Sequence, residues 1–576
     1  MKDSKTTAQA GNSVSAALPA QVETLAPAHP SAVPPAYTRE ELLAGKLRLT
    51  KVMPYQQAAP PFIGNLSLAV LSGLLLVFAF PDWNLWSLGW IAPAPLIMAA
   101  AREQRFWRAF LLGLVTGTIF YVGSSYWVTY SMHNYGGMSL PISYLAGIPL
   151  AAALGIFIAL FAAILSWAIA RLGGWAILSA PVIWAATEWL KVKLTGMGWN
   201  DLAYSQSFQP NVIQLSRWGG VYLVGSLLVA VSTGLVFAMV YLERRRGLVV
   251  LTIAGALAVG NLLYGQRITS KPQVPGTVHA GAVQPDVPIN GDWENSAFVD
   301  ELLRHHIKLS EDLIKSAAQQ TGRPELIIWP ESPMPFQYDQ DEGLRQTLAD
   351  FTTANKVSLL FNTWETPAGD GSRNSAVLIG PSGDKISEYD KIYLLPFGEY
   401  VPGRGWIPLM DRVSALVGEV TPGTTPTVSE VAGAKVGTLI CFETTRPELA
   451  RELRRAGATA LVQISNERWF GPTAAPRQML AHSIFRAVEN NVELIRATNS
   501  GLSAEIDPVG NVHGLTPMFE TAAESWPVKT TAEAKDDAVT FYTRHGDVFA
   551  IGCTVLTLLL GLAGFAARLS KAGQKD

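Results

Sequence analysis

Hydrophobic positions along the chain follow two different patterns. The first consists of eight long apolar segments, several of which exceed the roughly 20 residues that a bilayer core requires. These segments cover residues 63–80, 86–101, 109–130, 141–170, 174–190, 219–242, 248–264 and 547–567. The pattern predicts a membrane bundle of eight transmembrane α-helices. The second and fifth segments are short and contain proline, so their limits are the hardest to place.

The second pattern covers the region between the seventh and eighth segments, 266–546, where the apolar runs are shorter. A helical spacing of apolar residues covers 477–491, and the sequence Asp-Pro-Val-Gly at 507–510 predicts a hairpin turn. Short apolar runs bounded by polar sequence predict buried strands at 325–329, 357–361, 375–379, 436–440 and 459–464. Alternating strands and helices favour a layered α/β domain.

Basic residues in the short loops indicate the orientation. With a cytoplasmic N-terminus, the inside loops hold seven arginines, whereas the outside loop 131–140 holds no lysine or arginine. The outside loop 191–218 breaks this trend with Lys191, Lys193 and Arg217. The balance still predicts that both termini lie inside and that 266–546 lies outside the cytoplasmic membrane.

Five regions are therefore expected. Residues 1–61 are rich in Ala, Pro, Ser, Thr and Gln and predict a disordered cytoplasmic tail. The first thirty residues contain no apolar core of a signal peptide. The remaining regions are a seven-helix transmembrane domain at 62–265, an extracytoplasmic domain at 266–546, an eighth transmembrane helix at 547–567 and a cytoplasmic tail at 568–576.

Composition agrees with a membrane protein that carries a polar domain. Hydrophobic residues make up 49% of the chain and charged residues 16%, which is unusual for a soluble protein. A net charge of −2 gives no reason to expect a nucleic-acid partner. The two cysteines lie far apart, so neither a disulfide framework nor a metal site is expected.

Cys441 ends the apolar run 436–440, and polar sequence follows at once. A lone cysteine at a strand end is usually a small core residue, and Cys553, in the last apolar segment, is expected to be one. A cysteine nucleophile also needs a base and a charge that stabilises its thiolate. The eight histidines support that role weakly, because His482 falls in the predicted helix and is expected on its surface.

Two other motifs could supply these groups. Glu331 follows the run 325–329 beside Trp329 and Pro335, an apolar setting that would make it a stronger base than a solvated loop glutamate. Lys391 lies in the sequence Tyr-Asp-Lys, and an ammonium near the thiol would favour the thiolate and later an oxyanion. Taken singly, each pattern is also compatible with an ordinary surface residue.

Together, the order Glu331, Lys391, Cys441 resembles the Glu-Lys-Cys triad of the nitrilase, or carbon–nitrogen hydrolase, superfamily. The sequence motifs are most similar to those of its membrane-bound members, the apolipoprotein N-acyltransferases. The motifs that carry this resemblance are Trp-Pro-Glu at 329–331, Tyr-Asp-Lys at 389–391, Pro-Phe-Gly-Glu-Tyr-Val-Pro at 396–402, Ile-Cys-Phe-Glu at 440–443 and Ser-Asn to Trp-Phe-Gly at 465–471. The likeness continues through 474–510 and spans about 62 to 567.

The resemblance implies a nitrilase-like αββα sandwich on a membrane bundle and assigns roles to residues. Glu331 would be the general base, Lys391 the stabiliser of thiolate and oxyanion, and Cys441 the nucleophile. Glu399 matches a second glutamate that supports the triad. Phe442 departs from the tyrosine that is common after the cysteine.

Four further residues are implied less directly. Glu443 and Phe470 match positions near the site or on mobile arms, and Trp293 is a possible match to a tryptophan that contacts substrate. Phe397 and Phe470 are candidates to gate the site.

The implied reaction moves an acyl chain from a phospholipid, through a cysteine thioester, to the α-amino group of a diacylglyceryl-cysteine at the N-terminus of a lipoprotein. No cofactor or metal is implied. The implied place is the bacterial inner membrane, with multiple spans and the catalytic domain in the periplasm. The implied partners are the phospholipid donor, the lipoprotein acceptor and membrane lipids.

Two alternatives remain. A membrane-tethered nitrilase-like amidase would share the triad and release its product to water. A scaffold with a degenerate outer domain would have no need of an intact triad. The tryptophans Trp184, Trp189 and Trp199 are expected to anchor the chain at the outer membrane interface.

Overall fold

A computed structural model describes residues 62–103, 105–240, 244–320, 322–331, 336–366, 371–403, 420–536 and 538–572. The predicted tail 1–61 lies outside these residues, as do 573–576 of the predicted C-terminal tail. The statements below concern only the described residues.

Six described helices are long and apolar enough to cross a membrane. They are α3 (Phe62–Ala79), α5 (Phe106–Ser124), α7 (Leu140–Leu172), α10 (Ser216–Val240), α11 (Arg244–Thr269) and α18 (Val548–Ala572). Each matches one of the predicted apolar segments. Their bounds differ because polar and glycine residues at the segment ends still join the helices.

The second and fifth predicted segments form shorter helices. Each begins with a 3₁₀ turn, η2 (Trp86–Trp90) or η3 (Gly174–Ser179), which is followed by α4 (Pro93–Arg102) or α8 (Ala180–Thr195). Proline lies in the first turn of both α-helices, where its missing N–H leaves no intrahelical bond unmade. An apolar run therefore gives the length of the segment but not that of its helix.

Two other predicted segments are interrupted. The segment 109–130 divides between α5 and α6 (Trp127–Asn134). The helix α10 is kinked at Gly219 and Gly220, and Gly220 has a φ of 64°. A side chain at Gly220 would lie 2.7 Å from the Tyr542 ring, so glycine provides both the backbone conformation and the space.

The region 278–528 contains two six-stranded mixed sheets. The first has the order β12-β1-β2-β3-β4-β5 and the second β11-β10-β9-β8-β7-β6. The strands of the first are β1 (Val278–Gln284), β2 (Leu326–Ile328), β3 (Ser358–Glu365), β4 (Arg373–Ile379), β5 (Lys385–Asp390) and β12 (Ala522–Val528). Those of the second are β6 (Val428–Val431), β7 (Ala434–Ile440), β8 (Ala460–Ser465), β9 (Glu493–Thr498), β10 (Ala504–Ile506) and β11 (Val512–His513).

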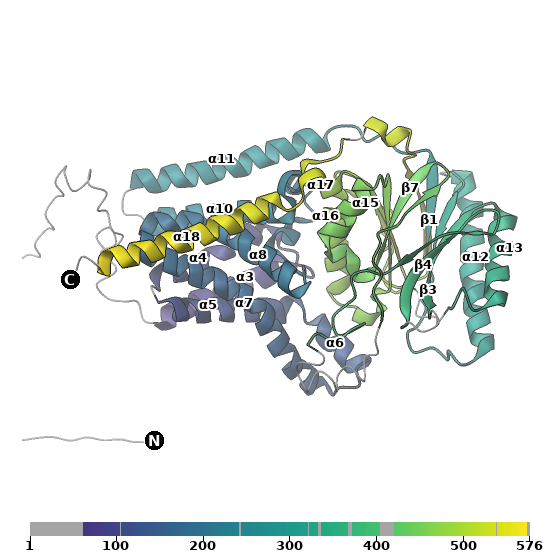
Figure 1. Cartoon of the computed structure of the whole chain (residues 1–576), viewed down its shortest axis with the longest axis horizontal. Coiled ribbons are helices and arrows are strands. Elements are labelled where there is room, and N and C mark those ends of the chain that lie inside the picture. The colour runs from purple at the N-terminus through teal and green to yellow at the C-terminus, as the bar shows by residue number, and fades with distance from the viewer. Residues whose placement is uncertain are drawn as a thin grey trace, which may run out of the picture. The chain divides into compact units, whose positions relative to one another are not determined.

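The five predicted strands and the hairpin between β10 and β11 are confirmed. The sheets pack face to face through a shared apolar core with members such as Ile328 and Leu378 from the first sheet and Ile440 and Ile464 from the second. The helices α12 (Ser296–Gln320) and α13 (Glu342–Asn355) cover the first sheet, and α15 (Pro447–Arg455) and α16 (Ala475–Asn490) cover the second (Figure 1). The result is the expected αββα sandwich.

The helix α16 belongs to two cores at once. Every residue of this helix except Arg477 is buried. Apolar residues such as Leu480 and Ile484 share one cluster with β9 and with residues of the membrane-type helices, among them Tyr222 of α10. A helix that is buried all round needs partners on every side. The α/β sandwich and the helical region therefore pack directly against each other through α16.

Candidate active site

The three candidate catalytic residues follow the C-terminal ends of three strands. Glu331 lies just after β2, Lys391 directly after β5, and Cys441 directly after β7. The strand β4 is antiparallel to both β3 and β5, and β2 is parallel to β3, so β2 and β5 run in the same direction. Their C-terminal ends therefore lie at the same edge of the first sheet, and Glu331 and Lys391 lie together there.

Lys391 lies between two glutamates. Its Nζ is 2.8 Å from Glu399 Oε1 and 3.6 Å from Glu331 Oε1, and all three side chains are largely buried. Burial would lower the pKa of Lys391, but the negative charges of Glu399 and Glu331 outweigh it and hold that pKa above its usual value. Lys391 is therefore a fixed positive charge.

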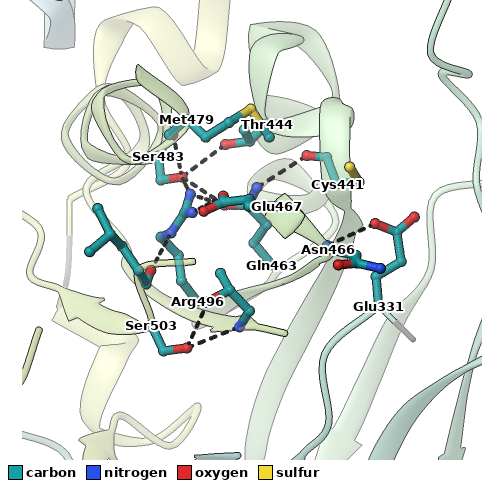
Figure 2. Close-up of polar contacts among 12 residues, drawn as sticks. Glu331, Cys441, Thr444, Gln463, Asn466, Glu467, Met479, Ser483, Arg496 and Ser503 are labelled. Carbon is teal, nitrogen blue, oxygen red and sulfur yellow. Dashed lines mark hydrogen bonds and ion pairs between the residues drawn. The ribbon is translucent and has the colours of Figure 1, made fainter. Parts of the chain in front are cut away.

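Both glutamates are also held by neutral donors. The Asn374 side-chain amide donates to Glu331 Oε1 at 2.9 Å and to Glu399 Oε1 at 3.0 Å. The backbone N–H of Asn466 donates to Glu331 Oε2 at 3.0 Å (Figure 2). The Leu395 N–H donates to Glu399 Oε2 at 2.7 Å. These contacts fix the orientation of both carboxyl groups.

Cys441 occupies a left-handed backbone conformation with φ of 53°. This conformation costs a residue with a side chain about 1–2 kcal/mol and is common at functional sites. Burial raises the pKa of the Cys441 thiol, the charge of Glu331 and a hydrogen bond to Glu331 raise it further, and Lys391 opposes them. The thiol is therefore held in its protonated form, with the Glu331 carboxyl near it.

Glu443 ties the cysteine turn to the loop that follows Lys391. Its Oε2 accepts from the Ile440 N–H at 2.7 Å. Its Oε1 accepts from the Tyr389 hydroxyl and the Ile392 N–H, both at 2.7 Å. The side chain is fully buried, and burial raises its pKa to about 7. Glu443 thus joins the two loops that carry the thiol and the ammonium.

An aromatic cluster begins at the residue after the nucleophile. Phe442 lies parallel to Trp199, with ring centroids 6.4 Å apart, and Phe470 meets Trp127 edge-on at 4.8 Å. All four side chains are buried in one apolar cluster, together with Met479. Trp127 begins α6, a short helix that packs against α7, so this cluster lies next to the helical region.

Two predicted site residues lie apart from this group. Trp293 donates to the Ile289 carbonyl at 3.0 Å and packs against Phe298, in the core that α12 and α13 form with the first sheet. Phe397 has φ of 63° and is 43% exposed, at the tip of the turn that ends in Glu399. The structure gives neither residue a contact with Glu331, Lys391 or Cys441 among the described interactions.

Three buried amide side chains are missing from the predicted site. Asn374 bridges the two glutamates, Gln463 donates to the Cys441 carbonyl at 3.1 Å, and the side-chain oxygen of Asn466 accepts from Asn499 at 3.1 Å. Asn374 and Gln463 lie inside strands, where the pattern of apolar residues identifies the strand but assigns no role to a polar residue within it. A polar residue within a buried strand was the available signal.

Two expectations about individual residues are wrong. His482 is fully buried, not on a helix surface, because both sides of α16 are covered, and its ring lies 3.9 Å from that of Tyr204. Trp184 and Trp199 are 3% and 2% exposed, so they pack inside the protein and are not anchors at a lipid surface. Cys553 is buried in α18, as expected.

The arrangement can perform acyl transfer. The Cys441 thiol, the Glu331 carboxyl and the Lys391 ammonium lie close enough to interact electrostatically, and all three side chains are buried. No group of three or more potential metal ligands is found among the described residues.

Comparison with known proteins first identifies the class of the α/β domain. The family description "Carbon-nitrogen hydrolase" matches residues 280–524, which contain all three candidate catalytic residues. The description "Apolipoprotein N-acyltransferase N-terminal domain" matches residues 72–234, which contain α5 and α7 and parts of α3 and α10.

Two curated relatives cover nearly the whole chain. An apolipoprotein N-acyltransferase of Geobacter metallireducens is 33% identical, over 86% of this chain and 95% of its own length. That of Azotobacter vinelandii is 31% identical, over 80% and 89%. The solved amidase from Nesterenkonia sp. AN1 is more distant, at 18% identity and a TM-score of 0.33, with 46% of this chain and 97% of the amidase covered. The chain belongs to the apolipoprotein N-acyltransferase family and is an enzyme.

Proposed function

We propose that this enzyme transfers an acyl chain from a phospholipid to the α-amino group of the N-terminal S-diacylglyceryl-cysteine of a lipoprotein. The relatives are named for N-acylation of an apolipoprotein. The observation that carries the proposal is the aromatic cluster of Phe442, Phe470, Trp127 and Trp199, which extends from the residue after the nucleophile to α6, a short helix packed against α7. An apolar wall beside a thiol suits a lipid substrate and has no use in hydrolysis of a small amide.

An apolar cavity extends this wall. Trp127 and Trp199 line it together with side chains of α5 and α7, such as Tyr121 and Leu154. Apolar lining with few polar groups is typical of sites that hold hydrocarbon. The cavity lies beside the cluster that includes Phe442 and would receive part of an acyl chain.

In the first half-reaction, Glu331 takes the proton of the Cys441 thiol, and Sγ attacks the ester carbonyl carbon. Lys391 and the Phe442 N–H stabilise the tetrahedral oxyanion; loss of one such donor typically costs about 3–4 kcal/mol. The ester C–O bond then breaks, Glu331 returns its proton to the leaving oxygen, and lysophospholipid departs. The acyl group remains as a thioester on Cys441.

In the second half-reaction, the α-amino nitrogen of the acceptor attacks the thioester carbonyl. Glu331 accepts a proton from this nitrogen, the C–S bond breaks, and the thiolate recovers a proton from Glu331. The thioester acylates an amine without ATP or a metal, because a thiolate is a good leaving group.

The proposal includes a location. Residues 62–265 and 547–567 would supply eight spans of a bacterial inner membrane, with α4 and α8 as the two short ones. Residues 266–546 would lie in the periplasm, with the termini in the cytoplasm. The excess of arginine in the loops assigned to the cytoplasm supports this orientation.

The test is incubation with phospholipid that carries a labelled acyl chain, followed by mass analysis of the Cys441 peptide. We expect a thioester adduct that is absent in Cys441→Ala and that passes to a diacylated lipopeptide. Acyl label on the protein that survives Cys441→Ala would reject the mechanism. Transfer to water in place of the lipopeptide would favour an amidase-like hydrolase.

A further inference from the structure

The peptide group between Cys441 and Phe442 is held by a side chain outside the triad. Gln463 of β8 donates from Nε2 to the Cys441 carbonyl oxygen at 3.1 Å (Figure 2). A trans peptide is planar, so its N–H points away from its C=O. The direction of the Cys441 carbonyl therefore fixes the direction of the Phe442 N–H, the proposed oxyanion donor.

The amide of Gln463 cannot turn round. Its Oε1 accepts from Ser483 Oγ at 2.7 Å and from Arg496 Nη1 at 2.9 Å. A guanidinium only donates hydrogen bonds, so a reversed amide would place an NH₂ group against Arg496. The Gln463 side chain is fully buried, so bulk solvent would not replace the lost bonds.

Arg496 is itself fixed from several sides. It forms a fully buried ion pair with Glu467, and it donates to Ser483 Oγ at 2.7 Å and to the Leu502 carbonyl at 3.1 Å. Glu467 directly follows Asn466, whose N–H holds Glu331. One arginine thus anchors both the turn that orients the base and the amide that orients the cysteine peptide.

Stability alone is a weak reason for such an arrangement. A buried ion pair loses hydration on both partners, and apolar replacements of similar volume are often equally stable or more so. Here the network reaches the Cys441 carbonyl directly, and through Glu467 it holds the turn in which the Asn466 N–H donates to Glu331.

We infer that Gln463 is a positioning residue that aims the Phe442 N–H at the developing oxyanion, and that Arg496 holds Gln463 in the orientation this requires. The inference rests on the proposed acyl transfer. An oriented oxyanion donor acts in the transition state, so its loss lowers kcat and leaves KM nearly unchanged. Both half-reactions pass through a tetrahedral oxyanion, so both are slowed.

Alkylation of the thiol by iodoacetamide separates this role from a structural one. Alkylation needs the same thiol but forms no oxyanion. We therefore compare the rate of acylation from labelled phospholipid with the rate of alkylation in Gln463→Met, a side chain of similar length without a donor. We expect the ratio of the two rates to fall by about 30-fold or more, which is less than the roughly 100- to 1,000-fold loss for a deleted oxyanion donor because the Phe442 N–H is misdirected and not removed. The exposed Gln346, changed in the same way, should keep the ratio of the unaltered protein.

If both rates fall equally in Gln463→Met, the thiol is generally disturbed and the inference is overturned. If neither rate changes, the inference is overturned as well. If this variant does not fold, Gln463→Glu replaces it, because a carboxylate still accepts from Arg496 and Ser483 but cannot donate to the Cys441 carbonyl. Its rate ratio should fall in the same way. No acyl label on the unaltered protein would reject the proposed acyl transfer and this role together. Label on the unaltered protein with an unchanged variant ratio would reject only the role of Gln463.

Discussion

Lys391 Nζ lies 2.8 Å from Glu399 Oε1, and both side chains are buried. Glu399 therefore shares the ammonium that would otherwise pair fully with Glu331, 3.6 Å away. Glu399 thus shares Lys391 with Glu331, the proposed base, and makes the shorter of the two contacts.

Glu399→Gln tests this relationship. With its first partner neutral, Lys391 should move closer to Glu331 and weaken it as a base. We expect acyl transfer to fall by about 100-fold, in the range for general base catalysis, with little change in KM. The same substitution at the exposed Glu430 should leave the rate unchanged. A rate for Glu399→Gln within threefold of that of the unaltered enzyme would contradict this role.

Glu331→Gln should make the Cys441 thiol easier to ionise and yet slow its acylation. The negative charge of Glu331 raises the pKa of the thiol, so its removal should lower that pKa. The midpoint of iodoacetamide alkylation against pH should move to lower pH. Acyl transfer should fall by about 1,000-fold, because the proton acceptor is lost. An upward shift of the alkylation midpoint would show that Glu331 does not oppose ionisation of the thiol.

Glu443→Gln should change the pH dependence of stability. Burial raises the pKa of Glu443 from 4.5 to about 7, so the folded state binds this proton more tightly than the unfolded state. The stability from this proton is complete below pH 4.5 and is lost as pH rises towards 7. Glutamine does not titrate, so the variant should be more destabilised relative to the unaltered protein at pH 5 than at pH 8. Thermal unfolding in detergent across this range measures the difference; the same difference at both values would contradict the assignment.

Gln478 is the polar contact between α16 and the aromatic cluster. Its Oε1 accepts from the indole N–H groups of Trp127 at 3.1 Å and Trp199 at 2.7 Å. Its Nε2 donates to the carbonyls of Pro81 and Ser124 at 3.1 and 2.8 Å. Methionine fills a similar volume but leaves these groups without their partner, at about 1–3 kcal/mol for each one that stays unpaired.

Gln478→Met should therefore lower the midpoint of thermal unfolding by several degrees. The exposed Gln340, changed to Met, is the matched control and should leave the midpoint within about 1 °C, as is usual for surface changes. A midpoint for Gln478→Met equal to that of the control would show that the four hydrogen bonds contribute little.

The sequence predicted those features that depend on short-range pattern. Strands are delimited by apolar runs, and a polar residue just beyond a run falls at the sheet edge, which is how Glu331 and Cys441 were found. Gln463 could not be assigned in this way. It lies within the run 459–464, and its partners Ser483 and Arg496 are distant in the chain and meet it only once α16 and β9 are packed.

The same limit explains the wrong prediction for His482. The helical period shows one apolar face of α16 and therefore predicts a surface position for His482. The second face is polar and equally buried, since Gln478 and Arg486 find partners in Trp199 and Tyr204. Periodicity cannot distinguish a polar face that meets water from one that meets another polar surface.

The complete burial of α16 has a consequence for where this protein can be divided. A cut at residues 266 and 546 would follow the predicted membrane boundary, yet it would expose Gln478, His482 and Arg486 to water without the partners that now satisfy or enclose them. It would also expose the apolar residues beside them on α16. The unit that folds is therefore larger than residues 266–546, because the helical region completes the burial of α16.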